Sequence, residues 1–147
     1  MSMTDLQAEH IRRECERVFM EIAWLTDHGP QHAIAQIFAD DGELDRDGTV
    51  LRGRAALLDL YAKRPASLMT RHLVSNVIVS LLSNERAVCQ AYATVYRFRT
   101  ADGSIPVPPV TCDGPESIVE YEDQMVRTNE GWKVGRRVMK TVIQVKK

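Results

Sequence analysis

The sequence predicts an α+β protein in which a helical layer packs on one face of a strongly curved, mostly antiparallel sheet. Three observations support this fold class. The first part of the chain repeats apolar residues at helical spacing. The second part contains four long runs rich in Val, Ile, Tyr and Thr, which are typical of strands. Helices that precede a series of strands favour an α+β arrangement, because each layer has one apolar side to bury.

The first element is a helix over residues 4–27. Its apolar residues recur every three or four positions and form one stripe, namely Ala8, Ile11, Cys15, Val18, Ile22 and Leu25. Thr4 is a suitable N-cap, and Gly29 followed by Pro30 ends the helix.

A second, short helix is expected next, ended by Asp40-Asp41-Gly42; its apolar face is Ala33, Ile34, Ile37 and Phe38. Residues 43–52 then predict a small hairpin, because Asp47-Gly48 is a strong turn signal. A third helix follows over residues 54–63, and its inward residues are expected to be Leu57, Leu58 and Tyr61.

The four expected strands cover residues 71–82, 86–99, 116–128 and 132–145. Tight turns at 83–85 and 129–131 join the first pair and the last pair. The remaining connection, residues 100–115, holds four of the six prolines and predicts an ordered flap or an exposed loop. The inward face of the run 116–128 stays open between two sets of side chains, Glu120, Glu122 and Gln124 or Tyr121, Asp123 and Met125.

Composition limits the possible functions. A chain of 147 residues without a linker, repeat or low-complexity segment predicts one domain over residues 1–147. A net charge of −1 without a basic stripe argues against a nucleic-acid partner, and the absence of a long apolar run argues against a membrane-spanning segment. The three cysteines, Cys15, Cys89 and Cys112, lack metal-ligand spacing, and we expect reduced thiols in a cytoplasmic protein.

Two residues carry the chemical hypothesis. Asp27 closes the first helix and His72 opens the first long strand. An Asp beside a His can hold one imidazole tautomer and stabilise its protonated form, as acid–base chemistry near neutral pH requires. Two plainer interpretations remain open: Asp27 is a solvated carboxylate or organises the Gly29-Pro30 turn, and His72 is a satisfied core residue or an interface residue. By strand alternation, His72 shares its face with Val74, Asn76, Ile78 and Ser80, while the more apolar opposite face is Leu73, Val77, Val79 and Leu81.

Four local motifs resemble the nuclear transport factor 2-like superfamily, and within it the SnoaL-like proteins, scytalone dehydratase and its relatives, and the β subunits of ring-hydroxylating dioxygenases. The motifs are Asp27-His28-Gly29 with residues 37–42, Arg52-Gly53-Arg54, residues 71–76, and Tyr121-Glu122-Asp123 leading to Gly131-Trp132-Lys133. The resemblance spans nearly the whole chain. It implies a single SnoaL-like domain with a cystatin-like α+β barrel, whose cone-shaped sheet wraps around three helices and leaves a cavity in its mouth.

The resemblance also assigns roles to residues. Asp27 and His72 match the working Asp–His dyad of the dehydratase-like members, whereas the second histidine of those enzymes has no counterpart in residues 86–99. Tyr61, Tyr96 and Tyr121 are available for the tyrosines that orient a water molecule there. Four further residues are candidates for substrate contacts, although Trp24 fits a packing or subunit contact equally well: Phe19, Ala23, Trp24 and Asn76.

The leading functional hypothesis is a dehydratase or isomerase that uses Asp27 and His72 without cofactor or metal, on a compact apolar substrate of polyketide, steroid or aromatic type. The alternative is a non-catalytic ligand-binding or oligomerisation domain, as the likeness to dioxygenase β subunits implies. An open cavity with both residues at its wall favours the enzyme, and a filled cavity favours the alternative. The resemblance further implies a homodimer formed through the outer face of the sheet.

Overall fold

The computed structural model describes residues 2–146 and confirms the α+β fold class. The elements in chain order are α1 (Asp5–His28), the 3-10 helix η1 (Gln31–Gln36), β1 (Phe38–Arg46), β2 (Thr49–Arg52), α2 (Arg54–Ala62), β3 (Leu68–Leu81), β4 (Arg86–Arg99), β5 (Ser117–Thr128) and β6 (Gly131–Gln144). The strands form one sheet in the order β2-β1-β6-β5-β4-β3, and all neighbours are antiparallel except β1 and β6.

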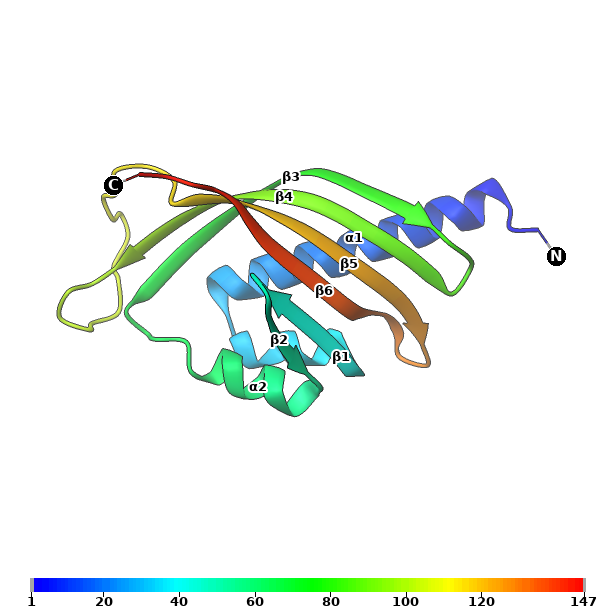
Figure 1. The fold of residues 1–147 in the computed structure, drawn as a ribbon, viewed down its shortest axis with the longest axis horizontal. Helices are drawn as coiled ribbons and strands as arrows, with labels where there is room; N and C mark the ends of the chain where they lie inside the picture. The colour runs from blue at the N-terminus through cyan, green and yellow to red at the C-terminus, as the bar shows by residue number, and fades with distance from the viewer. Residues whose placement is uncertain (1, 147) are drawn as a thin grey trace.

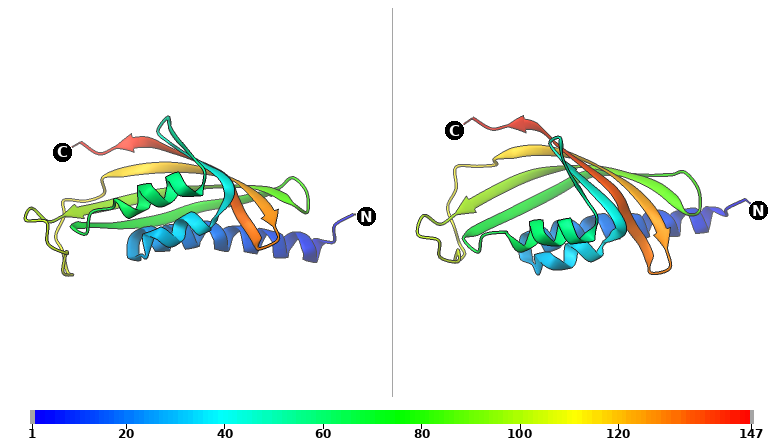
Figure 2. Two further views of the ribbon diagram at one scale, coloured as in Figure 1. Left: turned by 90° about the horizontal axis from the view of Figure 1, so that it is seen from below. Right: turned by 60° about the horizontal axis from the view of Figure 1, so that its bottom comes forward.

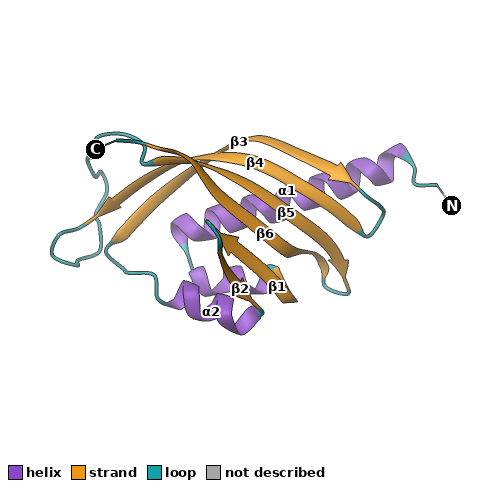
Figure 3. Cartoon of the chain, in the orientation of Figure 1, coloured by secondary structure: helices purple, strands orange, loops and turns teal. Residues whose placement is uncertain are grey.

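The helices lie on one side of the sheet, as Figures 1 and 2 show. The long helix α1 packs along β3 and also contacts β4 and β6, while α2 packs on η1 and the β1–β2 hairpin. The sheet twists strongly from β2 to β3, so that its strands curl around the helical layer (Figure 3). The C-terminal ends of α1 and α2 both lie toward the half of the sheet where β3 begins.

The first helix agrees closely with its prediction. Thr4 and Gln7 form a capping box, and the helix ends at Gly29, whose φ of 74° is a left-handed value that favours glycine. The stripe buries Ile11, Cys15, Val18, Phe19 and Ile22 against the sheet. Its last turn therefore has a fixed position relative to β3.

The prediction for residues 33–42 is wrong in part. The short helix is a 3-10 helix, and β1 already begins at Phe38, where it pairs with Val134 of β6. The expected helix-ending residues 40–42 lie inside β1, at a shift of register between Phe38 and Glu43. Gly42 is required at this bend, because a Cβ there would lie 2.9 Å from the Phe38 Cβ.

In α2, Leu57 is fully buried, but Leu58 is 41% exposed, contrary to the prediction. Tyr61 packs on the core as predicted, and Leu60, three positions after Leu57, packs there in place of Leu58. The expected hairpin at Asp47-Gly48 is confirmed, as are the four long strands, of which β3 begins three residues early at Leu68.

A bulge in β3 overturns the predicted faces of that strand. The register with β4 shifts between Ser75 and Ile78, and Asn76 has a φ of 55°. The extra residue reverses the alternation, so that His72 and Val74 lie on the same inner face as Val77, Val79 and Leu81. Asn76 and Ile78 are exposed on the outer face instead.

The open question about β5 is resolved by burial. Asp123 and Met125 are buried and Tyr121 packs on the core, whereas Glu120 is exposed on the other face. A second bulge, at the register shift opposite Gly135 in β6, places Val134 and Arg137 on the same inner face. Residues 100–115 form a loop that is exposed over most of its length.

Candidate functional site

A cavity of about 330 Å³ opens between the last turn of α1, the segment after α2, and the inner faces of β3, β4 and β6. Its lining combines apolar side chains such as Leu44, Leu60 and Met139 with His72 and several cationic side chains. A small recess of about 20 Å³, lined by Phe19, Ala23, His72, Tyr121 and Arg137 among others, extends it toward the core. This arrangement is a mixed apolar and polar pocket of the kind that binds small molecules.

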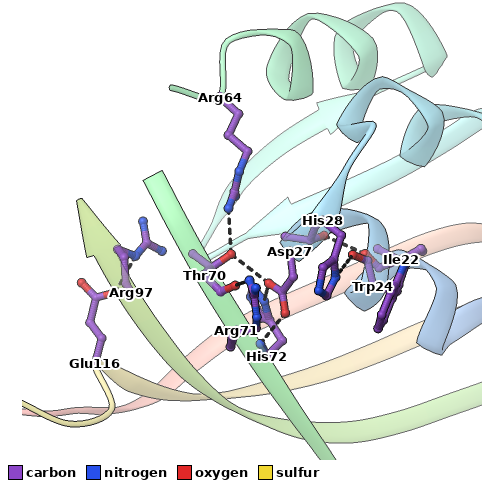
Figure 4. A network of polar contacts seen from close by, with 11 residues as sticks. Ile22, Trp24, Asp27, His28, Arg64, Thr70, Arg71, His72, Arg97 and Glu116 are labelled. Atoms are coloured by element: carbon purple, nitrogen blue, oxygen red, sulfur yellow. Dashed lines mark hydrogen bonds and ion pairs between the residues drawn. The ribbon is translucent and has the colours of Figure 1, made fainter. Parts of the chain in front are cut away.

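The structure brings Asp27 and His72 into direct contact at this cavity (Figure 4). The distance between Asp27 Oδ1 and His72 Nδ1 is 2.6 Å, and the His72 main-chain N–H donates to Asp27 Oδ2 at 2.7 Å. The His72 and Asp27 side chains are only 13% and 5% exposed. Because Asp27 accepts the Nδ1–H, neutral His72 keeps its lone pair on Nε2.

Two residues that the sequence analysis did not identify extend the hydrogen-bond network of Asp27. Thr70, two residues before His72 in β3, donates its hydroxyl to Asp27 Oδ1 at 2.8 Å. Arg64, in the segment after α2, donates from Nη2 to Thr70 Oγ1 at 2.7 Å. The carboxylate thus accepts three hydrogen bonds, and a chain of contacts connects it to a guanidinium (Figure 4).

The electrostatics keep Asp27 ionised. Burial on its own raises the pKa of this carboxyl, but the hydrogen bonds from the His72 ring and main chain and from Thr70 outweigh burial and lower the pKa below its ordinary value. An anionic Asp27 can stabilise the imidazolium that forms when His72 takes up a proton.

A buried ion pair forms the floor of the site. Arg137 donates from Nε and Nη2 to the two oxygens of Asp123, each at 2.7 Å, and both side chains are almost completely inaccessible. The guanidinium carbon also lies 4.8 Å and 4.9 Å from the ring centres of Phe19 and Tyr121. Burial opposes the charge, but Asp123 holds the pKa of Arg137 above its ordinary value, so a permanent cation faces the recess.

Two tyrosines lie at the cavity. Burial raises the pKa of Tyr121 to about 12 and also raises the pKa of Tyr61. Both phenols therefore remain protonated near neutral pH and can donate a hydrogen bond.

Four of the seven residues predicted to contact substrate lie at this site, namely Phe19, Ala23, Tyr61 and Tyr121. The other three lie elsewhere. Trp24 is 63% exposed and stacks on His28, with ring centres 3.9 Å apart. The bulge in β3 turns Asn76 outward. Val95 is buried on the inner face of β4, so the next residue, Tyr96, lies on the outer face.

Thr70, Arg64 and Arg137 could not be identified as site residues from the sequence alone. The position of Thr70 gives one indication, because a residue two positions before His72 in the same strand lies on the same face as His72. For Arg137 the sequence pattern is misleading, because alternation from Trp132 and Val134 predicts that Arg136, and not Arg137, lies on the inner face. The bulge at Gly135 moves Arg137 there instead.

In the part of the chain that the structure describes, neither a metal-binding cluster nor a buried cysteine offers a second chemical centre. Within residues 2–146, no three His, Cys, Asp or Glu side chains gather closely enough to bind a metal ion. The same residues include no helix with the length and apolar character needed to cross a membrane. Cys15 and Cys89 are buried, and burial raises the pKa of each thiol to about 12, which makes them poor nucleophiles.

Comparison with known proteins gives a family and a fold. The family model of the SnoaL-like domain matches residues 8–138. No curated protein sequence matches this chain.

Several solved structures are similar to the chain. A protein from Novosphingobium aromaticivorans named for scytalone dehydratase is 20% identical, with a TM-score of 0.81, and the match covers 99% of this chain and 92% of that one. The hexachlorocyclohexane dehydrochlorinase LinA-type3 from Novosphingobium barchaimii is 15% identical, with a TM-score of 0.78 and coverage of 97% and 93%. A nuclear transport factor 2-like protein with a cystatin-like fold, from N. aromaticivorans, is 21% identical, with a TM-score of 0.72 and coverage of 93% and 85%. At these identities the likeness establishes the fold.

Proposed function

This chain belongs to the SnoaL-like domain family of the nuclear transport factor 2-like superfamily, and we propose that it is a small-molecule lyase or isomerase in which His72 moves a proton. The observation that carries the proposal is that His72 lies at the wall of an open cavity and is hydrogen-bonded to Asp27 behind it. A base held in one tautomer by a buried carboxylate, beside a space for a ligand, is an arrangement suited to general acid–base catalysis.

The first step assigns His72 Nε2 as the base. It takes a proton from a carbon next to a carbonyl group, and the electron pair of the broken C–H bond delocalises onto the carbonyl oxygen. Asp27 stabilises the imidazolium that results, through the Nδ1–H hydrogen bond of 2.6 Å. Arg137 and Tyr121 supply a fixed positive charge and a phenol donor in the recess that His72 also lines, where they stabilise the enolate.

The second step decides between two outcomes. In a dehydration, the electron pair expels a β-hydroxyl group, and His72 returns its proton to the departing oxygen to form water. In an isomerisation, His72 returns the proton to another carbon of the delocalised system. Both outcomes regenerate neutral His72 and need no oxidant or reductant.

Two relatives support this class of reaction. One structural neighbour is named for a dehydratase and another is a dehydrochlorinase, and both names denote an elimination. The chain differs from the dehydratase-like pattern in having His72 as the sole histidine among the residues that line the cavity. The proposal therefore gives both proton transfers to one imidazole.

The cavity also favours an enzyme over a purely structural domain. A space of about 330 Å³ remains next to His72, and the hydrogen bond to Asp27 orients the imidazole at its wall. Asp27 lies behind His72 and Thr70 rather than at the surface of the cavity, which is the position of an orienting carboxylate.

The test is hydrogen–deuterium exchange at carbon in D₂O, followed by proton NMR with cyclohexanone, 2-tetralone and phenylpyruvate as probes. We expect the wild type to accelerate exchange on at least one probe and His72→Ala to lower that rate by about 10²–10⁴-fold. His32→Ala removes an exposed histidine outside the site and serves as the matched control. Equal exchange rates in the wild type and in His72→Ala would exclude this role of His72.

We further propose that the protein is a homodimer through the outer face of β3 and β4. Leu73, Ile78 and Tyr92 on this face are 54%, 59% and 45% exposed, which is unusual for neighbouring large apolar residues of a monomer. The cavity opens on the opposite, inner face, so this contact would leave the site accessible.

A further inference from the structure

The cavity beside His72 has an excess of positive charge that the rest of the chain does not share. Six cationic side chains line it, whereas the whole protein has a net charge of −1. The six are Arg46, Lys63, Arg64, Arg97, Arg99 and Arg137. No carboxylate is among the lining residues of this cavity.

Three of the six cations have a carboxylate partner nearby. Arg137 pairs with Asp123 at 2.7 Å, and Lys63 Nζ lies 2.7 Å from Asp59. Arg97 Nε lies 2.5 Å from Glu116 Oε2, and Figure 4 shows this pair apart from the contact between Asp27 and His72. These pairs reduce the charge that Lys63 and Arg97 can offer to a ligand, and Arg137 already faces the recess beside His72.

The other three cations, Arg46, Arg64 and Arg99, form no ion pair with any carboxylate in residues 2–146. They come from three elements that meet at the cavity, which are the end of β1, the segment after α2 and the end of β4. Arg64 reaches Asp27 only through Thr70. Cations gathered in a concave site without counter-charges repel one another and attract an anionic ligand.

The neighbouring positive charges affect the pKa of Arg64. Burial is the main cause that lowers the pKa of this guanidinium, and the charge of Asp27 acts in the opposite direction. The positive charges of Arg97 and Arg46 lower it further, which places both cations within electrostatic reach of Arg64. An anion between them would relieve this cost.

We propose that the substrate is a small organic anion whose carboxylate or phosphate group is bound by Arg46, Arg64 and Arg99. Its apolar part then lies against Leu44, Leu60 and Met139, which line the same cavity. Guanidinium groups bind both kinds of anion through paired, charge-assisted hydrogen bonds. The inference rests on the proposed function in one respect, since the bound anionic group directs a neighbouring C–H bond toward His72.

The test measures binding without turnover, using benzoate, its neutral analogue benzamide, and phenyl phosphate as probes. We expect the wild type to bind at least one of the two anions about tenfold more tightly than benzamide at low salt, and 0.5 M NaCl to weaken that preference. Tighter binding of phenyl phosphate than of benzoate assigns a phosphate group, and the reverse assigns a carboxylate.

Variants locate the anion site. Arg46→Gln and Arg99→Gln, changes at exposed residues without an ion pair, should each weaken binding of the preferred anion about fivefold or more and leave benzamide binding unchanged. Arg13→Gln, on the solvent face of α1, is the matched control and should bind all probes like the wild type.

The outcomes separate this inference from the proposed enzyme. Equal binding of anions and benzamide, or unchanged anion binding in both variants, overturns the anionic substrate even if His72-dependent proton exchange is observed. Selective anion binding that is lost in Arg46→Gln and Arg99→Gln supports it. If His72-dependent exchange is absent in that case, the site remains an anion-binding site and only the enzymatic proposal fails.

Discussion

One carboxylate fixes both the ring and the backbone of His72. Asp27 Oδ1 contacts the imidazole Nδ1 at 2.6 Å, and Asp27 Oδ2 accepts the main-chain N–H of the same residue at 2.7 Å. The C-terminal turn of α1 is thereby attached to the start of β3. The tautomer of the base and the position of its strand depend on the same side chain.

Asp27→Asn should therefore lower the proton-exchange rate nearly as far as His72→Ala, by about 10²–10⁴-fold. An amide NH₂ group facing Nδ1 donates rather than accepts, which moves the ring proton to Nε2 and removes the base. The exchange assay with the three probes measures this loss. A variant that keeps more than half of the wild-type rate would show that Asp27 does not orient His72.

Acid stability tests the same carboxylate without any substrate. Since folding lowers the pKa of Asp27, this group stabilises the protein fully above its unfolded-state pKa of about 3.9, and the contribution is lost as the pH falls through the lower, folded-state pKa. The free energy of unfolding of Asp27→Asn should therefore lie furthest below that of the wild type above pH 5, and the difference should shrink below pH 4.

Urea unfolding of both proteins between pH 3 and pH 7 provides the measurement, with Ser80→Ala, an uncharged exposed change in β3, as the control. A difference between wild type and Asp27→Asn that stays constant over this range would contradict a lowered pKa in the folded state.

The left-handed backbone of Asn76 in the β3 bulge leads to a separate prediction about the free energy of unfolding. Asn76→Val should reduce the free energy of unfolding by about 1–2 kcal/mol, because a β-branched residue is strained at a φ of 55°. Asn76→Gly should be close to the wild type. Equal stability of the valine and glycine variants in urea would show that the left-handed conformation is not required.

The two bulges also explain which features could be predicted from the sequence and which could not. Helix α1, the hairpin turn at Asp47-Gly48 and the long strands follow from local spacing and turn chemistry, and all are confirmed. The face of His72 and the inward position of Arg137 depend on one extra residue in each of β3 and β6. A period of two residues does not reveal such an insertion, so alternation assigned the wrong neighbours.

Asp27 and His72 are 45 positions apart in the chain, so local patterns do not relate them. The pairing of these two residues rests on the likeness of the motifs around them to those of a known family. Thr70 and Arg64 complete the network through hydrogen bonds across β3 and the segment after α2, and these depend on tertiary packing. Propensity and periodicity are local, and they do not encode such contacts.

From the exposed apolar residues on the outer face of the sheet we predict a dimer, which light scattering can detect. The wild type should have twice the protomer mass of 16.6 kDa, and the double variant Leu73→Lys/Ile78→Lys should have the protomer mass. Leu82→Lys changes an equally exposed leucine beyond the end of β3 and should leave the dimer intact. A monomeric wild type would refute the interface.

The buried pair of Arg137 and Asp123 allows structural and catalytic roles to be separated. Asp123→Leu or Arg137→Met alone leaves one charge buried without its partner, and each should destabilise the protein by about 3–5 kcal/mol. The double variant removes both charges from the same site. It should recover most of this loss, because two packed apolar side chains carry no desolvation penalty.

Activity should not recover with stability. The enolate in the proposed mechanism needs the positive charge of Arg137, so the double variant should remain about 10²–10³-fold slower than the wild type in proton exchange. Urea unfolding and exchange rates measured on the same four proteins give both quantities. A double variant that regains stability and exchange together would show that Arg137 only supports the fold, and the stabilising charge would then have to come from another cation of the cavity.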